Sequence, residues 1–495
     1  MAGAAFFDLD RTLLQGASGP VMSEALRDAG ILTSSKSPIE DALFGLFDLV
    51  GENRPSMVLA RLGVRFSKGW DAAAAADAGR SAAERLEPMI QPYARQLIDW
   101  HHGEGRSVVM ATTSPYPMCA HLGELLGLDD VIATSYGVDK GKYDGTVDGH
   151  YVWGPGKRDA VVEWCDANDV NLDESYAYSD SRYDLPLMRA VAHPVAVNPD
   201  PRLLVIATAA RWPVLYLDVP PGVPKVAGLV EPQKALLAMA RSEMVPYARF
   251  DIGGTDHLPA EGPVIVAANH RSYFDPLAIG MTLARTGRPA RFLAKKEVFD
   301  APVVGQVVKA LGTIRVDRGS GSSTPLNQAL EALSAGEVVV ILPEGTIPRG
   351  PAFFEPQLEG RRGVAELARK SGAPVVPLGI WGTENVWPRN SKLPMVWNVT
   401  SPPTVTVRMG APVDLSDFVK APKASKKKAG KESKAKVSKK SESAIKAREA
   451  SIVRTVMDSI SELLPEESRE IVSPTDEQLA RTYPSGAQPE VAVKG

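Results

Sequence analysis

Residues 263–278, "PVIVAANHRSYFDPLA", pass from an apolar run through a polar turn into the start of a helix. A short apolar run bounded by polar residues is typical of a buried strand, and Asp followed by Pro is common where a helix begins. His270 lies five positions before Asp275, a spacing of about 140° around a helix, so the two would not share one helical face. The stretch predicts a strand that brings an imidazole and a carboxylate to the turn before a helix.

The segments that follow repeat this pattern. Between about 233 and 415, apolar runs that end in polar groups alternate with helical patterns; the runs include "ARFLAKKE", "LGTIRVDR", "GEVVVILPEGT" and "APVVPLGIWG". Such alternation indicates βαβ units and a parallel sheet, in which ligands bind at the carboxyl ends of the strands. Taken alone, Asp275 fits a helix N-cap and His270 a loop histidine. The other polar turns favour a shared site.

A similar α/β pattern occupies residues 1–217. Its strand-like runs are "AAFFDLD" (4–10), "RSVVMATTS" (106–114) and "ESYAYSDS" (174–181), with helical patterns between them. Residues from about 15 to 95 interrupt the alternation, because they are rich in Ala and have almost no β-branched runs. The first domain is therefore predicted to be a Rossmann-like parallel sheet with an inserted helical cap.

The rest of the chain divides by composition. Residues 218–232 are rich in Pro and predict a linker to the second α/β domain at 233–415. Residues 420–446 contain eleven Lys and two Glu with hardly a large apolar side chain, so they are predicted to be disordered. Residues 447–495 are expected to hold an amphipathic helix and then a loose tail.

Overall composition excludes several classes of protein. A net charge of −3 over 495 residues argues against a general nucleic-acid binder, and no aromatic residues are interleaved with the lysines. Two cysteines cannot form a disulfide framework, which favours a reducing compartment. The most apolar stretch, 203–217, has 15 residues interrupted by Arg and Pro, fewer than the roughly 20 that span a bilayer. No leader and no transmembrane helix are expected.

Acidic side chains gather at the strand ends of the first domain. Asp8 and Asp10 end the first strand and point the same way, and Asp180 and Asp184 follow another strand. Converging carboxylates call for a hard cation such as Mg²⁺. With the Thr112 hydroxyl and Lys157, this set predicts phosphoryl transfer: Asp8 attacks phosphorus, Asp10 protonates the leaving oxygen and later activates water. Thr112 and Lys157 would hold the phosphoryl oxygens.

This set resembles the haloacid dehalogenase superfamily, in particular its phosphoserine phosphatase subgroup, over residues 4 to about 217. The shared features are the DxDxT motif (Asp8, Asp10, Thr12), the hydroxyl of "ATTS", the lysine of "GPGKRD" and the acids of "YSDSRYD". The resemblance implies that Mg²⁺ is held by Asp8, the backbone carbonyl of Asp10 and Asp180, with Asp184 in support. Phosphoserine enzymes place an acid early in the cap, whereas residues 13–23, "LLQGASGPVMS", contain none.

The second domain resembles the glycerolipid acyltransferases over about 245–390. "NHRSYFD" matches their HxxxxD motif, and "LGTIRVDR", "LPEGT" and "VVPLGI" match the next three blocks in order. The family resembled most is the 1-acylglycerol-3-phosphate O-acyltransferases. This implies that His270 is the general base and that Asp275 fixes its tautomer. The residues implied to hold the acceptor are Arg315, Arg318, Glu344, Gly345 and Thr346.

The sequence thus predicts a bifunctional enzyme of phospholipid biosynthesis. The second domain would acylate a lysophosphatidate-like acceptor from acyl-CoA, and the first would hydrolyse a phosphomonoester with Mg²⁺. Alternatives are another lysolipid or a glycoconjugate as acceptor, and a first domain that is a phosphoserine-type phosphatase or an inactive docking module. Because the acceptor lies in bilayers, an anionic membrane surface is the expected partner, bound through the lysines and the apolar segment 233–250. The segment fits a core helix equally well, and a lysine run can also be a solvated linker. The protein is expected to be cytoplasmic and to bind peripherally to the inner face of the plasma membrane. No nucleic-acid partner is expected.

Overall fold

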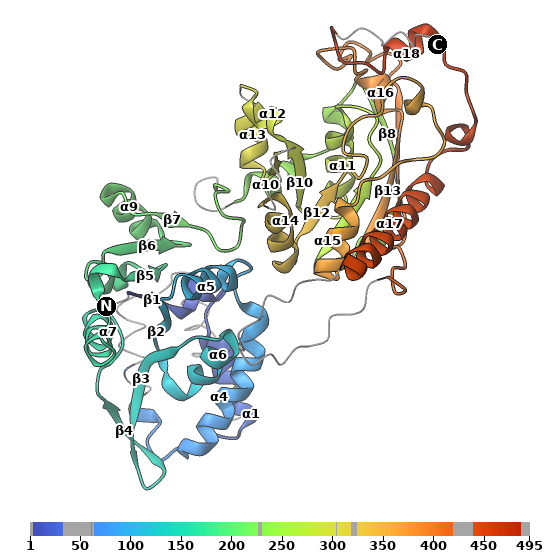
Figure 1. Ribbon diagram of the computed structural model, residues 1–495. Helices are drawn as coiled ribbons and strands as arrows, with labels where there is room; N and C mark the ends of the chain where they lie inside the picture. The colour runs from blue at the N-terminus through green and yellow to red at the C-terminus, as the bar shows by residue number, and fades with distance from the viewer. Residues whose placement is uncertain are drawn as a thin grey trace. The chain divides into compact units, whose positions relative to one another are not determined.

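The computed structural model describes residues 3–32, 61, 64–225, 230–302, 304–317, 324–418 and 439–486 (Figure 1). The chain forms two compact units, Met1–Gly222 and Val223–Gly495. Each is built on its own seven-stranded sheet, which confirms the predicted pair of α/β domains. The part of the predicted cap between 33 and 60 lies outside the described residues.

The first sheet has the order β4-β3-β2-β1-β5-β6-β7. Its strands are β1 (Ala4–Phe7), β2 (Ser107–Pro115), β3 (Asp130–Asp139), β4 (Lys142–Asp148), β5 (Tyr176–Ser179), β6 (His193–Val197) and β7 (Val214–Leu215). All neighbours are parallel except β3 and β4. The three strands expected from the sequence are β1, β2 and β5, which lie side by side in the centre. Their carboxyl ends therefore meet at one edge of the sheet.

Helices flank this sheet and form the described part of the cap. The helices beside the sheet include α6 (Tyr116–Leu126), α7 (Pro155–Ala167), α8 (Leu185–Met188) and α9 (Pro201–Ala210). The described helices inserted between β1 and β2 are α1 (Gly19–Asp28), α4 (Ala72–Leu86), η2 (Glu87–Met89) and α5 (Ala94–Gly103). The alanine run of α4 favours a helix, and its N-cap Asp71 accepts a hydrogen bond from the Ala74 amide at 2.9 Å. A Cβ at Gly79 would lie 2.0 Å from the Pro117 carbonyl oxygen, so α4 approaches α6 closely only because this residue is glycine.

The second sheet has the order β11-β10-β12-β9-β13-β14-β8. Its strands are β8 (Arg249–Gly253), β9 (Val264–Ala268), β10 (Ala290–Lys295), β11 (Ile314–Val316), β12 (Val338–Ile341), β13 (Val375–Trp381) and β14 (Thr404–Met409). All neighbours are parallel except β13 and β14. β9 is buried along its whole length, as its continuous apolar sequence predicts for a central strand covered on both faces.

Helices cover both faces of this second sheet (Figure 1). Side chains of β9 alternate between two cores: Val264 and Val266 pack with α11 (Asp275–Ala284), and Ile265 packs with the helices of the other face. Those helices are α14 (Thr324–Ser334), α15 (Gly363–Ser371) and α17 (Lys439–Glu462). Shorter helices are α10 (Pro232–Met239), α12 (Lys296–Asp300), α13 (Val304–Ala310), α16 (Thr383–Val386) and α18 (Asp476–Ala480).

The carboxyl-terminal part of the chain is more ordered than predicted. The amphipathic helix is present as α17, but it begins at Lys439, so the last residues of the segment expected to be disordered, 439–446, are helical. Residues 419–438 lie outside the described part of the chain. The tail expected to be loose holds α18, whose capping box joins Thr475 and Gln478, and a buried Thr482 that accepts a hydrogen bond from the Gly350 amide at 2.8 Å. The T-x-x-Q spacing was the sequence signal for this helix.

The apolar segment 233–250, for which the sequence left an interfacial segment and a core helix equally open, is only partly helical. α10 ends at Met239, a short turn covers Ser242–Met244, and the strand β8 begins at Arg249. Pro246 lacks the amide hydrogen that a continuing helix would need. Among the described residues, none of the helices is both long and apolar enough to cross a membrane.

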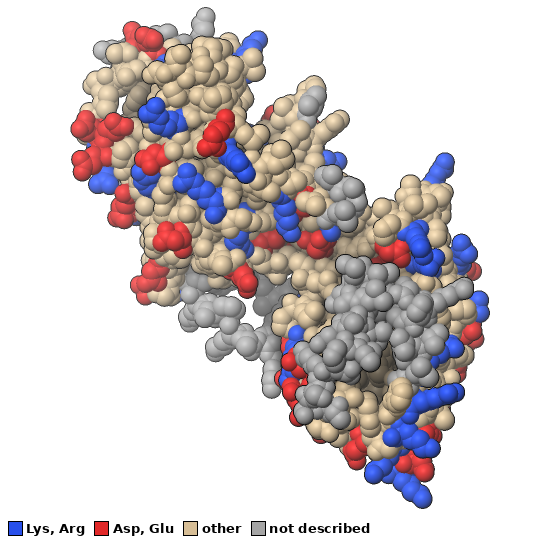
Figure 2. Space-filling model, turned by 180° about the vertical axis from the view of Figure 1, so that it is seen from behind, with Lys and Arg blue, Asp and Glu red and all other residues tan. Residues whose placement is uncertain are grey.

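Charged side chains of both signs are interspersed over the face of the molecule in Figure 2. This distribution accords with the small net charge of −3. No large field of one sign is visible on that face among the described residues, so local clusters, rather than the net charge, are the features from which binding must be argued.

Candidate active sites

The first cluster lies at the carboxyl ends of β1, β2 and β5. Asp8 directly follows β1, and its amide continues the ladder to the Tyr178 carbonyl at 3.0 Å. Thr12, in the kinked turn η1 (Leu9–Leu13), accepts a hydrogen bond from the Asp180 amide at 3.0 Å through its hydroxyl. Thr12 therefore ties the DxDxT motif to the end of β5, although 168 positions separate it from Asp180.

Lys157 joins two of the predicted carboxylates. Its Nζ donates to Asp8 Oδ1 and to Asp184 Oδ2, each at 2.8 Å, and its side chain is only 1% exposed. The Ser179 hydroxyl also donates to Asp184 Oδ2, at 2.7 Å. A buried ammonium is tolerated only when it is paired and hydrogen-bonded, and the two carboxylates satisfy that need here.

Asp10 is held by the loop that follows the motif, and Thr112 by a neighbour on its own strand β2. Asp10 Oδ1 accepts a hydrogen bond from the Ser18 amide at 2.7 Å. The Ser18 and Ser114 hydroxyls are 3.3 Å apart, and the Ser114 amide donates to the Thr112 hydroxyl at 3.3 Å. Sequence reasoning did not single out Ser18, because nothing in its spacing shows that it caps a carboxylate.

Burial shifts the acids of this cluster toward their protonated forms. Burial raises the pKa of Asp8 from 3.8 to about 7, against the opposing effect of Lys157 and with further increases from Asp184 and Asp10. Burial also raises the pKa of Asp10, while its hydrogen bonds with Ser18 act in the opposite direction. Three carboxylates thus share one buried ammonium, which leaves a surplus of negative charge when all three are ionised.

These residues fit a hard divalent cation. Among the described residues, the structure contains no group of three or more His, Cys, Asp or Glu side chains that could hold a metal ion. The set implied for Mg²⁺ is smaller, because it needs only the side chains of Asp8 and Asp180 and one backbone carbonyl. Asp184 Oδ1 is buried without a hydrogen-bond partner among the described residues. Surplus negative charge and oxygen donors are what Mg²⁺ requires.

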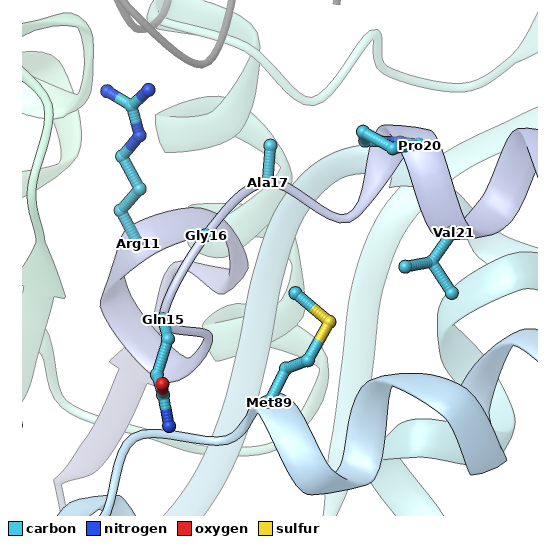
Figure 3. A pocket seen from close by; sticks show the side chains of 7 residues that line it. All are labelled: Arg11, Gln15, Gly16, Ala17, Pro20, Val21 and Met89. Carbon is cyan, nitrogen blue, oxygen red and sulfur yellow. The ribbon is translucent and has the colours of Figure 1, made fainter.

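A pocket of about 430 Å³ is lined by Arg11, which follows Asp10 in the chain, and by the loop before Ser18 (Figure 3). Arg11 lies on one side, Pro20 and Val21 lie on the other, and the Met89 side chain points between them. Among the described residues, the lining is Arg11, Gln15, Gly16, Ala17, Pro20, Val21 and Met89. The pocket is therefore bounded by the loop that holds Asp10 and by the end of the cap.

The second cluster surrounds Asp275, the first residue of α11. Asp275 is fully buried, and its Oδ2 lies 2.7 Å from His270 Nδ1. The same oxygen accepts hydrogen bonds from the amides of Arg271 and Ser272 at 2.7 and 2.9 Å, and Oδ1 accepts from the Thr383 hydroxyl at 2.6 Å. The five-residue spacing is explained by a loop that wraps around the carboxylate.

This arrangement sets the tautomer of His270. Because Asp275 Oδ2 already accepts two amide hydrogens, His270 Nδ1 acts as the donor in their contact. Nε2 of the neutral ring is then the acceptor and is available as a base. The geometry therefore allows an imidazole to take a proton while a buried carboxylate stabilises the resulting cation.

Glu344 supports the same loop from the turn that follows β12. Its Oε1 accepts a hydrogen bond from the His270 amide at 2.9 Å. Burial raises its pKa from 4.5 to about 8; the His270 amide lowers it, and Asp275 raises it further. Gly345 has φ 70°, which a glycine adopts without strain, and Thr346 is half-buried beside it. Glu344, predicted to hold the acceptor, thus contacts the His270 backbone.

Arg271 is a functional candidate that sequence reasoning missed. Its Nε and Nη2 donate to Glu384 Oε1 at 2.9 and 2.7 Å. The guanidinium also lies over the rings of Trp381 and Phe353, at 3.8 and 4.3 Å from their centroids. Its place directly after His270 in the motif was the available signal.

The predicted arginine pair is not brought to His270 by any recorded contact among the described residues. Arg315 lies on β11 with its side chain 43% exposed, 3.9 Å from Asp300 and from Asp317. Arg318 lies outside the described residues. The structure therefore brings together His270, Asp275 and Glu344, and leaves Arg315 near the end of the sheet.

Comparison with known proteins matches each unit separately. The family model described as haloacid dehalogenase-like hydrolase matches residues 5–189, and the one described as acyltransferase matches residues 249–381. The chain is 32% identical over 244 residues to the inhibition of morphological differentiation protein of Streptomyces azureus, covering 48% of this chain and 87% of that protein.

Two further relatives cover different parts of the chain. Phosphoserine phosphatase SerB1 of Mycobacterium tuberculosis is 30% identical over 253 residues, 48% of this chain and 80% of that protein. The 1-acyl-sn-glycerol-3-phosphate acyltransferase BAT2 of Brassica napus is 29% identical over 160 residues, 31% of this chain and 43% of that protein. Through its first unit the chain belongs to the haloacid dehalogenase-like hydrolases, and an acyltransferase domain follows in the same polypeptide.

Proposed function

We propose that the chain is a bifunctional enzyme of phospholipid biosynthesis. The second unit transfers an acyl group from acyl-CoA to 1-acylglycerol 3-phosphate, which forms phosphatidate. The first unit hydrolyses a phosphomonoester with Mg²⁺. The observation that carries the acyltransferase assignment is the contact of 2.7 Å between His270 Nδ1 and a fully buried Asp275, supported by the likeness to an enzyme named for this reaction.

The geometry supports direct acyl transfer. His270 Nε2 takes the proton from the acceptor hydroxyl, and the hydroxyl oxygen attacks the thioester carbonyl. The carbon–sulfur bond breaks, and the proton passes from His270 to the thiolate. Asp275 stabilises the imidazolium between these steps and undergoes no bond change itself. Glu344 and Thr383 keep the histidine loop and Asp275 in place.

The acceptor phosphate is assigned to the arginines of the second unit. Arg315 has an exposed guanidinium, and Arg binds phosphate through two parallel hydrogen bonds. Arg318 is assigned with it on its sequence position alone. Gly345 and Thr346 lie next to Glu344 and border the same turn, so they are assigned to the acceptor side.

The phosphatase reaction follows from the first cluster. Mg²⁺, when bound, offsets the charge of the carboxylates and of the substrate phosphoryl group. Asp8 attacks phosphorus, the bond to the leaving oxygen breaks, and Asp10 gives that oxygen its proton, which its raised pKa makes available. Lys157, 2.8 Å from Asp8 Oδ1, is placed to hold the transferred group, with Thr112. Asp10 then takes a proton from the water that hydrolyses the aspartyl-phosphate.

A membrane surface is the proposed place of the reaction. The loop after α16, residues 388–403, contains no acid and has an exposed Lys392, and its Leu393 and Trp397 are 67% and 70% exposed. It starts beside the dyad, because the Ser272 hydroxyl donates to the Trp387 carbonyl at 2.7 Å. Trp is favoured at the membrane interface. With the lysines of 420–446, this supports peripheral binding to the inner face of the plasma membrane, in the cytoplasm.

The two assignments are tested with full-length wild type, H270A and D8N. Each is incubated with Mg²⁺, labelled 1-acylglycerol 3-phosphate and an acyl-CoA, and lipids and released phosphate are measured. H270A is expected to lose phosphatidate formation and keep phosphatase activity, and D8N the reverse. Acylation by H270A at the wild-type rate would refute the acyltransferase mechanism. Parallel acceptors, another lysolipid and a glycoconjugate, show whether the acceptor is assigned correctly.

A further inference from the structure

The Arg271 side chain is fixed by one carboxylate and two aromatic rings. Its Nε and Nη2 donate to Glu384 Oε1 at 2.9 and 2.7 Å. Its guanidinium lies over the rings of Trp381 and Phe353, 3.8 and 4.3 Å from their centroids. Because only 11% of the side chain is exposed, water competes little for these contacts, which strengthens both the charged hydrogen bonds and the ring contacts. The guanidinium is therefore held in one position.

This fixed residue acts on the dyad through its own backbone. The Arg271 amide donates at 2.7 Å to Asp275 Oδ2, the same oxygen that contacts His270 Nδ1. On α16, Thr383 directly precedes Glu384, and its hydroxyl donates to Asp275 Oδ1 at 2.6 Å. Two neighbours on one helix thus hold the carboxylate and the guanidinium. A displacement of Arg271 would withdraw its amide from Asp275 and change the orientation of the imidazole.

The segment that follows α17, residues 463–486, holds the first of the two rings. Trp381 Nε1 donates to Glu467 Oε1. Nearby on β13, a Cβ at Gly379 would lie 2.8 Å from Leu463 Cβ, so the segment packs directly against the strand that carries the indole. The position of the Trp381 ring therefore depends on this segment.

The same segment holds the turn that carries the second ring. Phe353 is the last residue of η7 (Gly350–Phe353). The Gly350 amide donates to the Thr482 hydroxyl at 2.8 Å, and a Cβ at Gly350 would lie 2.7 Å from the Tyr483 hydroxyl oxygen. The segment therefore fixes η7 by a hydrogen bond and by close packing.

We propose that Arg271 is a positioning residue for acyl transfer, and that residues 463–486 complete the acyltransferase site by fixing the rings against which Arg271 packs. The matched acyltransferase region ends at residue 381, so this support comes from outside it. In the proposed function, on which this inference rests, Arg271 acts on the reacting imidazole only through Asp275. Its loss therefore slows the chemical step and leaves the binding of both substrates unchanged.

Arg271 is tested with full-length wild type, R271M, R271K and the control R408M, whose arginine pairs with Asp251 in the same unit. Steady-state acylation gives kcat, and KM for acyl-CoA and for 1-acylglycerol 3-phosphate. We expect the kcat of R271M to fall at least about ten-fold, with both KM values unchanged. R271K should keep part of the rate, because lysine retains the charge but not the planar fork, and R408M should match the wild type. A loss seen only in KM would overturn the positioning role.

A double-mutant cycle tests the link to residues 463–486. E467A and W381F each remove the hydrogen bond between these two side chains, and W381F keeps an aromatic ring at its position. We expect each to lower kcat about two- to five-fold, as the loss of one hydrogen bond predicts, and neither to lower it further when combined with R271M. The control E466A changes the exposed neighbouring acid and should keep the wild-type rate. An equal loss with and without R271M would overturn the role of the segment.

Stability and the other unit distinguish the possible failures. Tm and phosphatase activity are measured in the same preparations, and R271K replaces R271M in the cycle if R271M does not fold. A lowered kcat at unchanged Tm in R271K and E467A supports positioning. Equal acylation by the wild type and R271M would overturn the inference alone. A wild type that acylates neither 1-acylglycerol 3-phosphate, nor another lysolipid, nor a glycoconjugate would overturn the acyltransferase function, and the inference with it.

Discussion

Asp275 accepts hydrogen bonds from four donors in the second unit: His270 Nδ1, two backbone amides and the Thr383 hydroxyl. Only the histidine could be inferred from the sequence, because its motif lies within five residues. Thr383 is 108 positions away and reaches the carboxylate only because β13, which precedes it, pairs with β9. At the residue scale, the local motif identifies the reacting side chains, whereas the side chains that orient them are identified only by tertiary contacts.

Replacing Thr383 by Val should therefore slow acyl transfer without weakening substrate binding. The change leaves Asp275 Oδ1 buried without a partner, at a cost of about 1–2 kcal/mol. We expect kcat to fall by roughly ten-fold, with KM unchanged, while T383S keeps most of the activity. Steady-state kinetics with acyl-CoA and 1-acylglycerol 3-phosphate provide the measurement. A change in KM alone would show that Thr383 does not act through Asp275.

Replacing Glu344 by Gln should change how stability depends on pH. The folded-state pKa of Glu344 is raised from 4.5 to about 8, so the folded protein binds more protons than the unfolded chain between these values. The wild type therefore loses stability as pH rises through this window, by up to about 1.4 kcal/mol per pH unit. E344Q is expected to lose less, so its Tm relative to wild type should rise from pH 5 to pH 8. A constant difference in Tm would contradict this.

At the scale of elements, α17 shows what amphipathic periodicity can and cannot predict. The spacing of apolar residues identified the helix, but the sequence did not show which elements this helix packs against. Ile452, Val456 and Ile460 are fully buried in the core shared with α15. The lysine-rich composition before the helix also concealed its beginning at Lys439.

Truncating one buried side chain of α17 should destabilise the second unit. I452A removes a fully buried side chain, which typically costs about 2–5 kcal/mol. The matched control is I445A on the same helix, whose side chain is 38% exposed and whose loss should cost well under 1 kcal/mol. Urea unfolding measures both changes. Equal effects would mean that α17 does not form part of the core.

The buried ammonium provides the corresponding test in the first unit. K157M leaves Asp8 and Asp184 without their shared cation, and breaking a buried charge pair costs about 3–5 kcal/mol. We expect phosphatase activity to be lost and the free energy of unfolding of the first unit to fall. Acyltransferase activity, measured in the same preparation, should be unchanged.

At the scale of the whole molecule, the two units have separate hydrophobic cores. We therefore expect calorimetry to resolve two unfolding transitions. K157M should lower the temperature of one transition and I452A the temperature of the other. A single transition that both substitutions lower equally would show that the units unfold together.

The sequence by itself determined the two α/β units, the acids of the first site and the histidine and aspartate of the second, because strand and helix periodicity and short motifs are local properties. Only the tertiary structure decided that Lys157 joins Asp8 to Asp184, that Thr383 holds Asp275, and that α17 completes a core. Those contacts join residues from 27 to more than 100 positions apart, and such pairs meet only through the order of strands in a sheet and the packing of helices against it.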